Sequence, residues 1–255
     1  MTHFSENLHI SAMVQIGKLN TKIDLSNLAK SLETNDNILY IEHGSHINKG
    51  VNNKKFSKKK RESRKYFYNQ VTIHLFNSLK ANHRVNVKVF NNGTIQMTGV
   101  NSDKIGETTI KTLIEELNQL SNEDIFETNE IQSVGCLETV LINSDFDIHN
   151  KINRESLHRL IIQNGYLSSF EPCTYPGVNI KYYHNPLKKN FGICDCDKPC
   201  NGKGKDNTCK KITVAVFKSG KIIITGGRSK NNIQTAYEFI TEFIDENSEE
   251  ILVKK

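Results

Sequence analysis

The sequence predicts an α+β fold built from two tandem repeats, each an antiparallel sheet with helices on one face. Residues 86–100 (NVKVFNNGTIQMTGV) and 213–227 (TVAVFKSGKIIITGG) are identical at seven of fifteen positions, at an offset of 127 in a chain of 255 residues. In both copies apolar and polar residues alternate around a glycine-containing turn, which is typical of a hairpin with one buried face. Apolar residues at spacings of three and four follow each copy and predict a helix. A hairpin and helix repeated in the same order indicate a duplication.

The first repeat contains further alternating and helical patterns that place its other elements. We expect a strand at residues 8–16, a helix from about Asp24, a short strand at 38–41, a strand at 68–75 and the helix that ends near Leu120. The acidic stretch 122–130 is interpreted as a linker. The first domain is therefore assigned to residues 1–130.

The second repeat, assigned to residues 131–255, follows the same order. A strand is expected at 137–143, a helix at about 155–163 and a strand at 178–183, entered through Pro172 and Pro176. The segment YPGVNIKY at Tyr175 matches YNQVTIHL at Tyr68 with an offset of 107, which is 20 residues shorter than the offset of the hairpins. The difference predicts an insertion in the second repeat at about 190–209.

Charge is concentrated in a second insertion, at residues 49–65. This run holds nine Lys and Arg against Glu62 alone, whereas the whole chain has a net charge of +6, so the remainder is slightly acidic. A solvated loop, a nucleic-acid contact and a nuclear-import signal all fit such a run. No apolar stretch is long enough to cross a membrane, and no secretory signal is recognisable, so we expect a soluble intracellular protein.

The segment SSFEPCTYPGVNIKY, followed by FKSGKIIITGGRS, resembles the second repeat of the TATA-box-binding protein (TBP) family. The first half is similar through KIDLSNLA and VFNNGTIQMTG, and the resemblance covers roughly residues 8–245. The basic insertion and the Asn/Lys-rich composition look similar to the divergent versions carried by large DNA viruses. The resemblance implies a pseudo-twofold saddle, with one curved antiparallel sheet and helices on its convex face.

The resemblance also implies a function. Proteins of this family bind the minor groove of promoter DNA through the concave face, insert apolar wedges and bend the duplex. Double-stranded DNA, a general transcription factor of the B type and the RNA polymerase machinery are the implied partners. The implied location is the nucleus or a cytoplasmic viral factory, and the protein could also be packaged in the virion.

Alternation sorts the residues of both hairpins onto two faces. Val87, Val89, Ile95, Met97, Val214, Val216, Ile222 and Ile224 are expected to face the helices. The opposite face, which the resemblance assigns to DNA, receives Lys88, Phe90, Gln96, Thr98, Ala215, Phe217, Ile223 and Thr225. Further candidate DNA contacts are Thr72, Asn179, Lys181, Lys221 and Arg228.

The candidate wedges are aromatic residues at equivalent positions of the two repeats. Phe90 pairs with Tyr68, or with Phe67 if the register slips by one, and Phe217 pairs with Tyr175. The family carries an Asn on the first strand of each half, and by register these positions are Ser11 and Thr139 here. The accompanying Thr pair is retained as Thr98 and Thr225, and Gln96 adds an amide. A strict preference for TATA is therefore not implied.

Four of the six cysteines, Cys194, Cys196, Cys200 and Cys209, lie within 16 residues as C-x-C-x3-C-x8-C. Zinc takes four such ligands in a tetrahedron, and a short loop without an apolar core can be ordered by the metal alone. Unpaired or disulfide-forming thiols and a redox role remain open, because C-x-C is tighter than the usual spacing. Cys136 and Cys173 are expected to be ordinary half-buried residues.

The sequence indicates no enzyme, since it lacks the phosphate-binding G-x-x-x-x-G-K-[ST], H-E-x-x-H and H-x-E motifs that would signal catalysis. Three classes remain: a DNA-bending transcription initiation factor, a saddle-shaped module that binds or sequesters transcription factors without sequence-specific DNA binding, and a substrate-binding module of a nucleic-acid enzyme. A strong salt dependence of DNA binding distinguishes the first class from the second.

Overall fold

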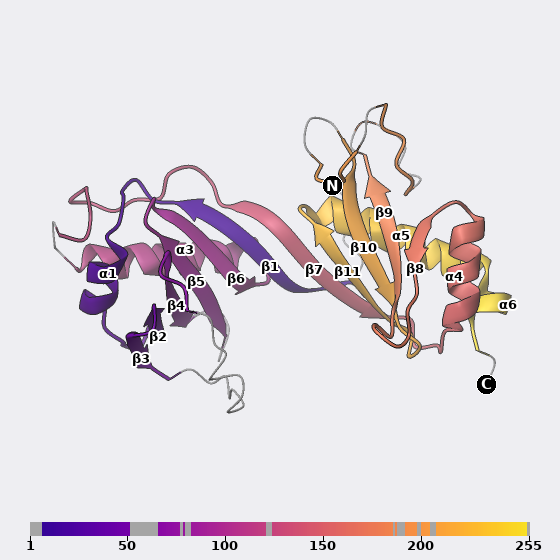
Figure 1. Cartoon of the computed structure of the whole chain (residues 1–255), viewed down its shortest axis with the longest axis horizontal. Helices are drawn as coiled ribbons and strands as arrows, with labels where there is room; N and C mark the ends of the chain where they lie inside the picture. The colour runs from indigo at the N-terminus through magenta and orange to yellow at the C-terminus, as the bar shows by residue number, and fades with distance from the viewer. Residues whose placement is uncertain are drawn as a thin grey trace. The chain divides into compact units, whose positions relative to one another are not determined.

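The computed structural model describes residues 7–51, 66–76, 79, 83–120, 124–185, 187, 192–197, 200–204 and 208–253. The chain forms two compact units (Figure 1). The first-repeat unit comprises residues 13–139. The second-repeat unit comprises residues 140–255 together with the start of the chain up to Ala12. Both units combine antiparallel strands with helices, so the α+β class is confirmed. The predicted division at residues 130 and 131 stays a prediction about the repeats.

The first-repeat unit is an antiparallel sheet in the order β3-β2-β4-β5-β6-β1. Its strands are β1 (His9–Lys18), β2 (Ile38–His43), β3 (Ile47–Gly50), β4 (Gln70–Phe76), β5 (Arg84–Phe90) and β6 (Thr94–Val100), and its helices are α1 (Leu25–Ser31) and α3 (Asp103–Asn118). Asp24 caps α1 by accepting a hydrogen bond from the backbone N–H of Asn27. The helix predicted from Asp24 and the one predicted to end near Leu120 are confirmed. The basic run from residue 52 to 65 lies outside the described residues.

The hairpin of β5 and β6 has the predicted buried face, because Val87, Val89, Ile95 and Met97 are all 0% exposed. Its turn needs glycine. Gly93 has φ of +79°, and a Cβ there would lie 2.3 Å from the carbonyl oxygen of Thr21. The turn is thus held against the chain that leaves β1.

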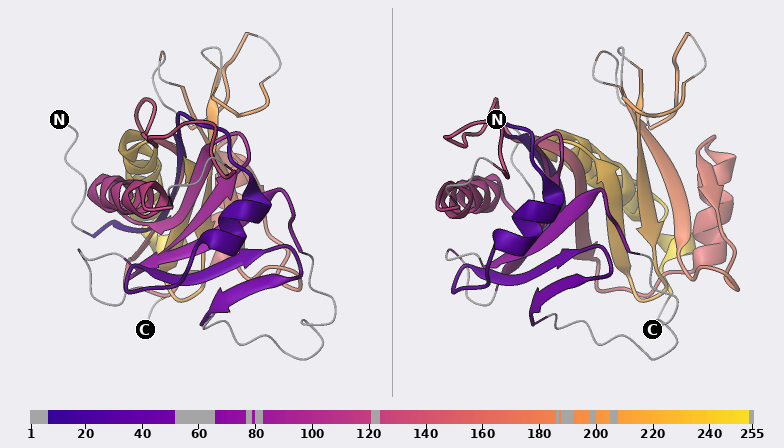
Figure 2. Two further views of the ribbon diagram at one scale, coloured as in Figure 1. Left: turned by 90° about the vertical axis from the view of Figure 1, so that its left-hand side faces the viewer. Right: turned by 60° about the vertical axis from the view of Figure 1, so that its left-hand side comes forward.

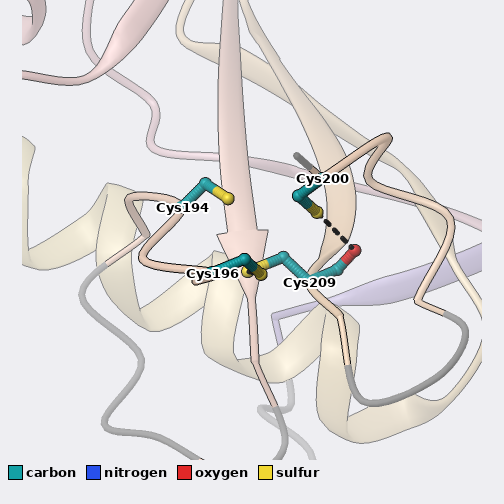
Figure 3. A group of neighbouring side chains, drawn as sticks. All are labelled: Cys194, Cys196, Cys200 and Cys209. Carbon is teal, nitrogen blue, oxygen red and sulfur yellow. Dashed lines mark hydrogen bonds between the residues drawn. The ribbon is translucent and has the colours of Figure 1, made fainter. Parts of the chain in front are cut away.

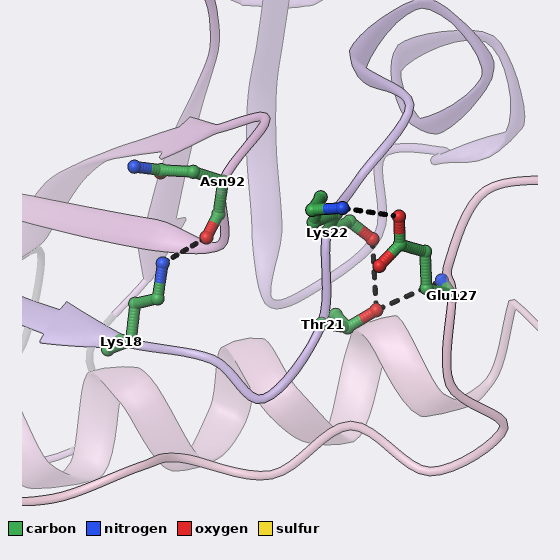
Figure 4. Close-up of polar contacts among 5 residues, drawn as sticks. All are labelled: Lys18, Thr21, Lys22, Asn92 and Glu127. Atoms are coloured by element: carbon green, nitrogen blue, oxygen red, sulfur yellow. Dashed lines mark hydrogen bonds and ion pairs between the residues drawn. The ribbon is translucent and has the colours of Figure 1, made fainter.

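The interpretation of the acidic stretch as a linker is wrong for residues 124–130, because this segment packs on the first-repeat unit. Ile125 and Phe126 are 2% and 9% exposed, so two apolar side chains of this segment are buried despite their acidic neighbours. The backbone N–H of Glu127 donates to the Thr21 hydroxyl at 3.0 Å, and its carboxylate pairs with Lys22 at 3.1 Å (Figure 4). At the end of β1, the Lys18 ammonium donates to the carbonyl of Asn92.

The second-repeat unit is an antiparallel sheet in the order β7-β11-β10-β9-β8. Its strands are β7 (Glu138–Asp147), β8 (Leu167–Ser169), β9 (Val178–His184), β10 (Lys210–Val216) and β11 (Lys221–Gly227), and its helices are α4 (Arg154–Gln163), α5 (Lys230–Glu246) and α6 (Ser248–Ile251). The N-terminal part of β1 completes this unit, since the Ser11 hydroxyl donates to the carbonyl of Asn143 at 3.2 Å.

Helix α5 packs on β9, β10 and β11 and buries the second hairpin. Val214, Val216, Ile222 and Ile224 are 0% exposed, as predicted. Gly220 has φ of +95° and approaches the Asn150 carbonyl oxygen so closely that a Cβ would lie 2.3 Å from it. The two repeats therefore use glycine for the same structural reason at equivalent turns.

The described parts of the segment between β9 and β10 extend past the ends of both strands (Figure 2). No helix in the described part of the chain has the length and apolar character needed to cross a membrane.

Candidate nucleic-acid interface and cysteine cluster

In the described part of each unit, the alternate side chains of the hairpin strands are fully buried on one face of the sheet and mostly half-buried on the other, and we call the second face the open face. It carries the side chains that alternate with the buried ones. In the first-repeat unit, the strand register aligns Thr72, Lys88 and Gln96 across β4, β5 and β6, and it aligns Asn86 with Thr98. All five are half-buried, as expected for side chains that stand on an uncovered sheet surface.

The open face of the second-repeat unit follows the same register. Asn179, Ala215 and Ile223 align across β9, β10 and β11, and Lys181, Thr213 and Thr225 form the next row. Ala215 is only 3% exposed, because its small side chain stands between Asn179 and Ile223. The rest of this set is half-buried. The two open faces thus occupy equivalent positions with different side chains.

Phe217 and Tyr175 form an aromatic pair at one end of the second open face. Their ring centroids lie 5.8 Å apart at an interplanar angle of 60°. Gly177 provides the space for this pair, because a Cβ there would lie 2.8 Å from the Tyr175 ring and 3.2 Å from that of Phe217. Tyr175 is 38% exposed, so part of this apolar surface is available to a partner.

The equivalent end of the first-repeat unit is arranged differently. Tyr68 packs toward β2: its hydroxyl lies 3.0 Å from that of Ser45, and its ring meets His43 edge-on at 6.4 Å. Phe67 instead lies over the open face, since the Lys88 ammonium is 6.0 Å from the centre of its ring. Among the described residues, no ring contact joins Phe90 to Phe67 or Tyr68. Phe67 is therefore the better counterpart of Tyr175.

A polar pair that sequence reasoning missed lies on the second open face. The Thr225 hydroxyl donates to the Oδ1 atom of Asn143, which stands opposite it in β7. The amide group of Asn143 therefore has its oxygen occupied and its NH2 group directed elsewhere. In the first-repeat unit the residue opposite Thr98 is Val14, and the Thr98 hydroxyl donates to the Asn86 carbonyl at 3.4 Å. The signal in the sequence was the parity of Asn143, which alternates with Ile142.

The two hydroxyl residues predicted to replace the family's Asn pair already have partners within the protein. Ser11 donates to the Asn143 carbonyl. The Thr139 hydroxyl accepts a hydrogen bond from Gln15 at 3.3 Å, and Gln15, only 2% exposed, also donates to Asp103 of α3 at 3.2 Å. The assignment of Ser11 and Thr139 to DNA stays a prediction, and the side chain beside Thr225 is Asn143.

The cationic residues predicted to contact DNA differ in the partners that they have within the protein. Lys181 donates to the Thr213 hydroxyl at 3.0 Å, and burial, together with the charge of Lys211, holds its pKa below the usual value. Lys221 is paired with Asp145 at 2.8 Å, and the hydrogen bond and charge of this carboxylate raise the pKa of Lys221. Arg228 follows β11 just before the cap of α5, where its backbone N–H donates to Asn232.

Asp145 places a carboxylate among the residues predicted to face DNA. Its partner in β11 is Ile223, a residue of the open face. The hydrogen bond from Lys221 lowers the pKa of Asp145, and the charge of Lys221 acts in the same direction. The carboxylate is thus ionised at neutral pH and cancels the charge of Lys221.

The four predicted cysteine ligands converge at the ends of β9 and β10 (Figure 3). Their Sγ atoms all lie within 4.8 Å of one another, so the cluster could hold a metal ion. Cys209 is buried directly before β10, and burial, followed by the neighbouring thiols, raises its pKa to about 12 in the absence of a cation. The expectation that Cys136 and Cys173 are half-buried is wrong, because both lie on exposed loops.

Comparisons with known proteins agree with this architecture. Residues 142–247 match the family model described as transcription factor TFIID, or TATA-binding protein. A protein of Acanthamoeba polyphaga mimivirus called "TATA-box-binding protein-like" is 31% identical over 253 residues, which cover 92% of this chain and 64% of the relative. The TATA-box-binding protein of Methanocaldococcus jannaschii is 24% identical over 166 residues, or 65% of this chain and 71% of the relative.

The solved structure of Methanococcus jannaschii TBP superposes with a TM-score of 0.56 at 19% identity, covering 94% of this chain and 99% of that one. The duplicated α+β units with one uncovered sheet face thus define a protein of the TBP fold. With the family match over residues 142–247 and the mimivirus relative, the chain is similar to divergent TATA-box-binding proteins. It spans just under two thirds of the mimivirus relative's length.

Proposed function

We propose that this protein is a TBP-like transcription initiation factor that binds the minor groove of promoter DNA, inserts aromatic wedges and bends the duplex to recruit the transcription machinery. The observation that carries the proposal is the pair Phe217 and Tyr175, held side by side on an open face by the space above Gly177. Rings on an uncovered sheet surface gain by burial against a partner, and a flexible base step offers apolar surface of that size.

The first-repeat unit supplies the second wedge in this proposal, with Phe90 and Phe67 as the candidate rings. Phe67 is 55% exposed and its ring lies beside Lys88, so an inserted ring and a phosphate contact occur together. Tyr68 supports β2 through Ser45 and is a weaker candidate. The Thr98 and Thr225 hydroxyls, Gln96, Asn179 and the amide of Asn143 then face the floor of the groove.

Bending measured by energy transfer between dyes at the two ends of a duplex tests the wedges. Phe217→Ala and Phe90→Ala should each remove part of the bend and weaken binding, by roughly 1–3 kcal/mol if the loss matches that of a ring stacked on a base. Ile162→Ala, a change at a half-exposed residue of α4 on the helical side, is the matched control and should leave both unchanged. A full bend in both Phe variants contradicts the proposal.

The preferred DNA sequence is best found by selecting bound duplexes from a random pool. The proposal predicts an A·T-rich site, because amide and hydroxyl groups can donate to the acceptors that A·T pairs present in the minor groove, whereas the amino group of guanine obstructs them. Enrichment of no sequence, together with an unbent duplex, contradicts it.

The partners in this proposal are double-stranded promoter DNA, a general transcription factor of the B type and the RNA polymerase machinery. The site of action would be the nucleus or a cytoplasmic viral factory, with packaging in the virion as a further option. The zinc ion that we expect in this protein belongs to the cysteine cluster and takes no part in the contact with DNA.

Asp145 favours a second candidate function, a saddle-shaped module that binds or sequesters transcription factors without sequence-specific DNA binding. A carboxylate on the open face repels phosphates, and the adjoining half-buried Ile223 offers apolar surface suited to a protein partner. Because contacts with phosphates release counterions, a steep fall of DNA affinity with salt supports the first function. Affinity for DNA that is weak at low salt and insensitive to sequence supports the second.

A further inference from the structure

The inserted loop between β9 and β10 gathers four thiols at one point. Cys194 and Cys196 follow β9, Cys209 directly precedes β10, and Cys200 comes from the turn between them. The Sγ atoms of Cys196 and Cys209 lie 3.4 Å apart, and all four Sγ atoms lie within 4.8 Å of one another (Figure 3). In a tetrahedral zinc site with Zn–S bonds of about 2.3 Å, neighbouring sulfurs lie about 3.8 Å apart. The observed separations bracket this value.

We infer that Cys194, Cys196, Cys200 and Cys209 bind one Zn²⁺ ion as thiolates, and that the ion fastens the inserted loop to the ends of β9 and β10. Binding replaces four S–H protons by four Zn–S bonds and releases the protons to solvent, so no oxidant or reductant is needed. The inference is independent of the proposed contact with DNA.

The backbone around the cluster supports thiolate ligands. The N–H of Gly202 donates to the Sγ atom of Cys200 at 3.3 Å. This bond joins a cysteine to the residue two positions later. Hydrogen bonds of this kind hold metal-bound sulfurs in place and offset part of their negative charge.

The charges around the cluster also fit a metal site. Zn²⁺ with four thiolates carries a formal charge of −2 (+2 − 4). Lys203 forms a bridge with Lys210, and the N–H of Lys211 donates to the Gly202 carbonyl at 2.8 Å, so three cations border the loop. None of the three has an ion pair with a carboxylate in the described part of the chain. The segment that holds the cluster thus carries the positive charges of these three residues and the negative charges of Asp195 and Asp197.

The loop has few other means of fixing its position. Its described hydrogen bonds to the sheet include backbone bonds: the N–H of Tyr183 in β9 donates to the carbonyl of Gly192 in the loop. Beside β10, the N–H of Gly204 donates to the carbonyl of Cys209. Among its described residues Cys209 is buried at 0% exposure and Ile193 is 45% exposed, so these residues supply little apolar packing. A metal that joins both sides of the loop supplies the missing cross-link.

The test is the metal content of the protein purified without added zinc, together with the visible spectrum of a cobalt-substituted sample. We expect one equivalent of zinc by elemental analysis, and the d–d bands of a tetrahedral tetrathiolate cobalt site. Cys200→Ser should lower zinc affinity by at least tenfold. Cys173→Ser changes an exposed cysteine outside the cluster, and as the matched control should bind zinc normally.

Hydrogen exchange shows what the ion does. Chelation should accelerate exchange at residues 192–197 and 200–204 while β7, β11 and α5 remain protected. Less than half an equivalent of zinc together with four freely titratable thiols would overturn the inference. So would a disulfide between Cys196 and Cys209, detected by mass spectrometry without reductant. Failure of DNA bending would leave this result unaffected, because metal content is measured without DNA.

Discussion

Gly177 and Gln70 occupy equivalent positions in the two repeats, and they explain why the two aromatic ends differ. Gly177 has no side chain, so the Tyr175 and Phe217 rings meet above it. Gln70 stands opposite Phe90, is only 7% exposed and donates to the Thr72 hydroxyl at 3.0 Å. Its side chain occupies the space that the second repeat leaves free, and Tyr68 packs toward β2 instead.

Gly177→Ala should therefore damage the second wedge and leave the fold intact. The added Cβ would lie 2.8 Å from the Tyr175 ring and 3.2 Å from that of Phe217, so both rings must shift; Tyr175 is exposed and Phe217 half-buried, which leaves them room to do so. We expect weaker DNA binding and a smaller bend, with the melting temperature nearly unchanged. Gln70→Ala is the matched change in the first repeat and removes an obstacle instead of adding one. Equal loss of binding in both variants contradicts the explanation.

The ion pair between Asp145 and Lys221 defines a second residue-level test. The hydrogen bond between the two side chains lowers the pKa of Asp145 and raises that of Lys221. A lowered carboxyl pKa stabilises the fold above the unfolded value and is lost as pH falls through the folded value. A raised Lys pKa stabilises below 10.5 and is lost at higher pH. The pair should therefore contribute between about pH 4 and pH 10 and fade on either side.

Asp145→Asn should strengthen DNA binding at neutral pH, because it removes a charge that repels phosphate and frees Lys221. The slope of log affinity against log salt should steepen by about 0.9 if Lys221 then reaches one phosphate. Unfolding followed from pH 3 to pH 7 should show that the variant loses the part of the pH dependence due to this carboxyl. An unchanged slope would instead favour the protein-binding function.

At the scale of elements, the two hairpin turns make equal demands on their glycines. Gly93 and Gly220 both have positive φ, and a Cβ at either position would lie 2.3 Å from a carbonyl oxygen. Gly93→Ala and Gly220→Ala should each reduce the free energy of unfolding by about 1–3 kcal/mol, measured by urea denaturation. Gly135→Ala is the control, because φ there is +71° but no atom lies within 4 Å of the added Cβ. A cost at Gly135 as large as at Gly220 would show that the close contacts add nothing.

The first residues of the basic insertion contribute to the fold, so a deletion of the insertion must leave them in place. Lys49 belongs to β3, and its ammonium donates to the carbonyls of Lys30 and Leu32 and pairs with Glu33. A deletion should therefore begin after Val51. Replacing residues 52–65 by a short Gly-Ser linker removes eight cations and Glu62.

If Lys54, Lys55, Lys58, Lys59, Lys60 and Arg61 contact phosphates, the deletion should flatten the salt dependence by about 0.9 per contact. The selected DNA sequence should stay the same, because phosphate contacts carry no sequence information. Replacing Lys49 alone should lower the melting temperature and leave the salt slope as it is. An identical slope after the deletion would return the insertion to the solvated-loop or nuclear-import interpretation.

Long alternating segments were predictable from the sequence, and short ones were not. The hairpin strands span seven residues each and have one fully buried face, so their pattern is strong. The sequence showed no β3, β8 or α6, since three or four residues cannot display a period. The segment at Ile125 and Phe126 was misread because its acidic neighbours dominate the composition while two apolar side chains decide the packing.

The sequence predicted which face the site residues occupy better than it predicted which residues they contact. Parity placed Phe90, Phe217, Thr98 and Thr225 on the open faces. Asn143 was missed because the strand was predicted to end there, whereas β7 continues to Asp147. The contact of Thr139 with Gln15 depends on the burial of Gln15 against α3, which alternation in one strand cannot reveal.

At the scale of the whole molecule, the two open faces present different chemistry. The first carries Gln96, Lys88 and Thr72 where the second carries Ile223, Ala215 and Asn179. We therefore expect the selected DNA site to be asymmetric and the protein to bind it in one preferred orientation. Asn143→Val, which copies Val14 of the first repeat, should weaken this preference, measured with a dye at one end of the duplex. A palindromic selected site contradicts this expectation.

The first strand has a consequence for synthesis on the ribosome. His9 to Ala12 belong to the second-repeat unit, where His9 lies 3.7 Å from Asp145, although the chain makes them about 130 residues earlier. The first-repeat unit can fold once Thr139 has left the ribosome. His9 to Ala12, however, remain unpaired until β7 has been made. Such a delayed, non-local pairing is slow and leaves a strand edge open to other chains. The nascent protein should thus depend on protection of His9 to Ala12 until β7 has been made.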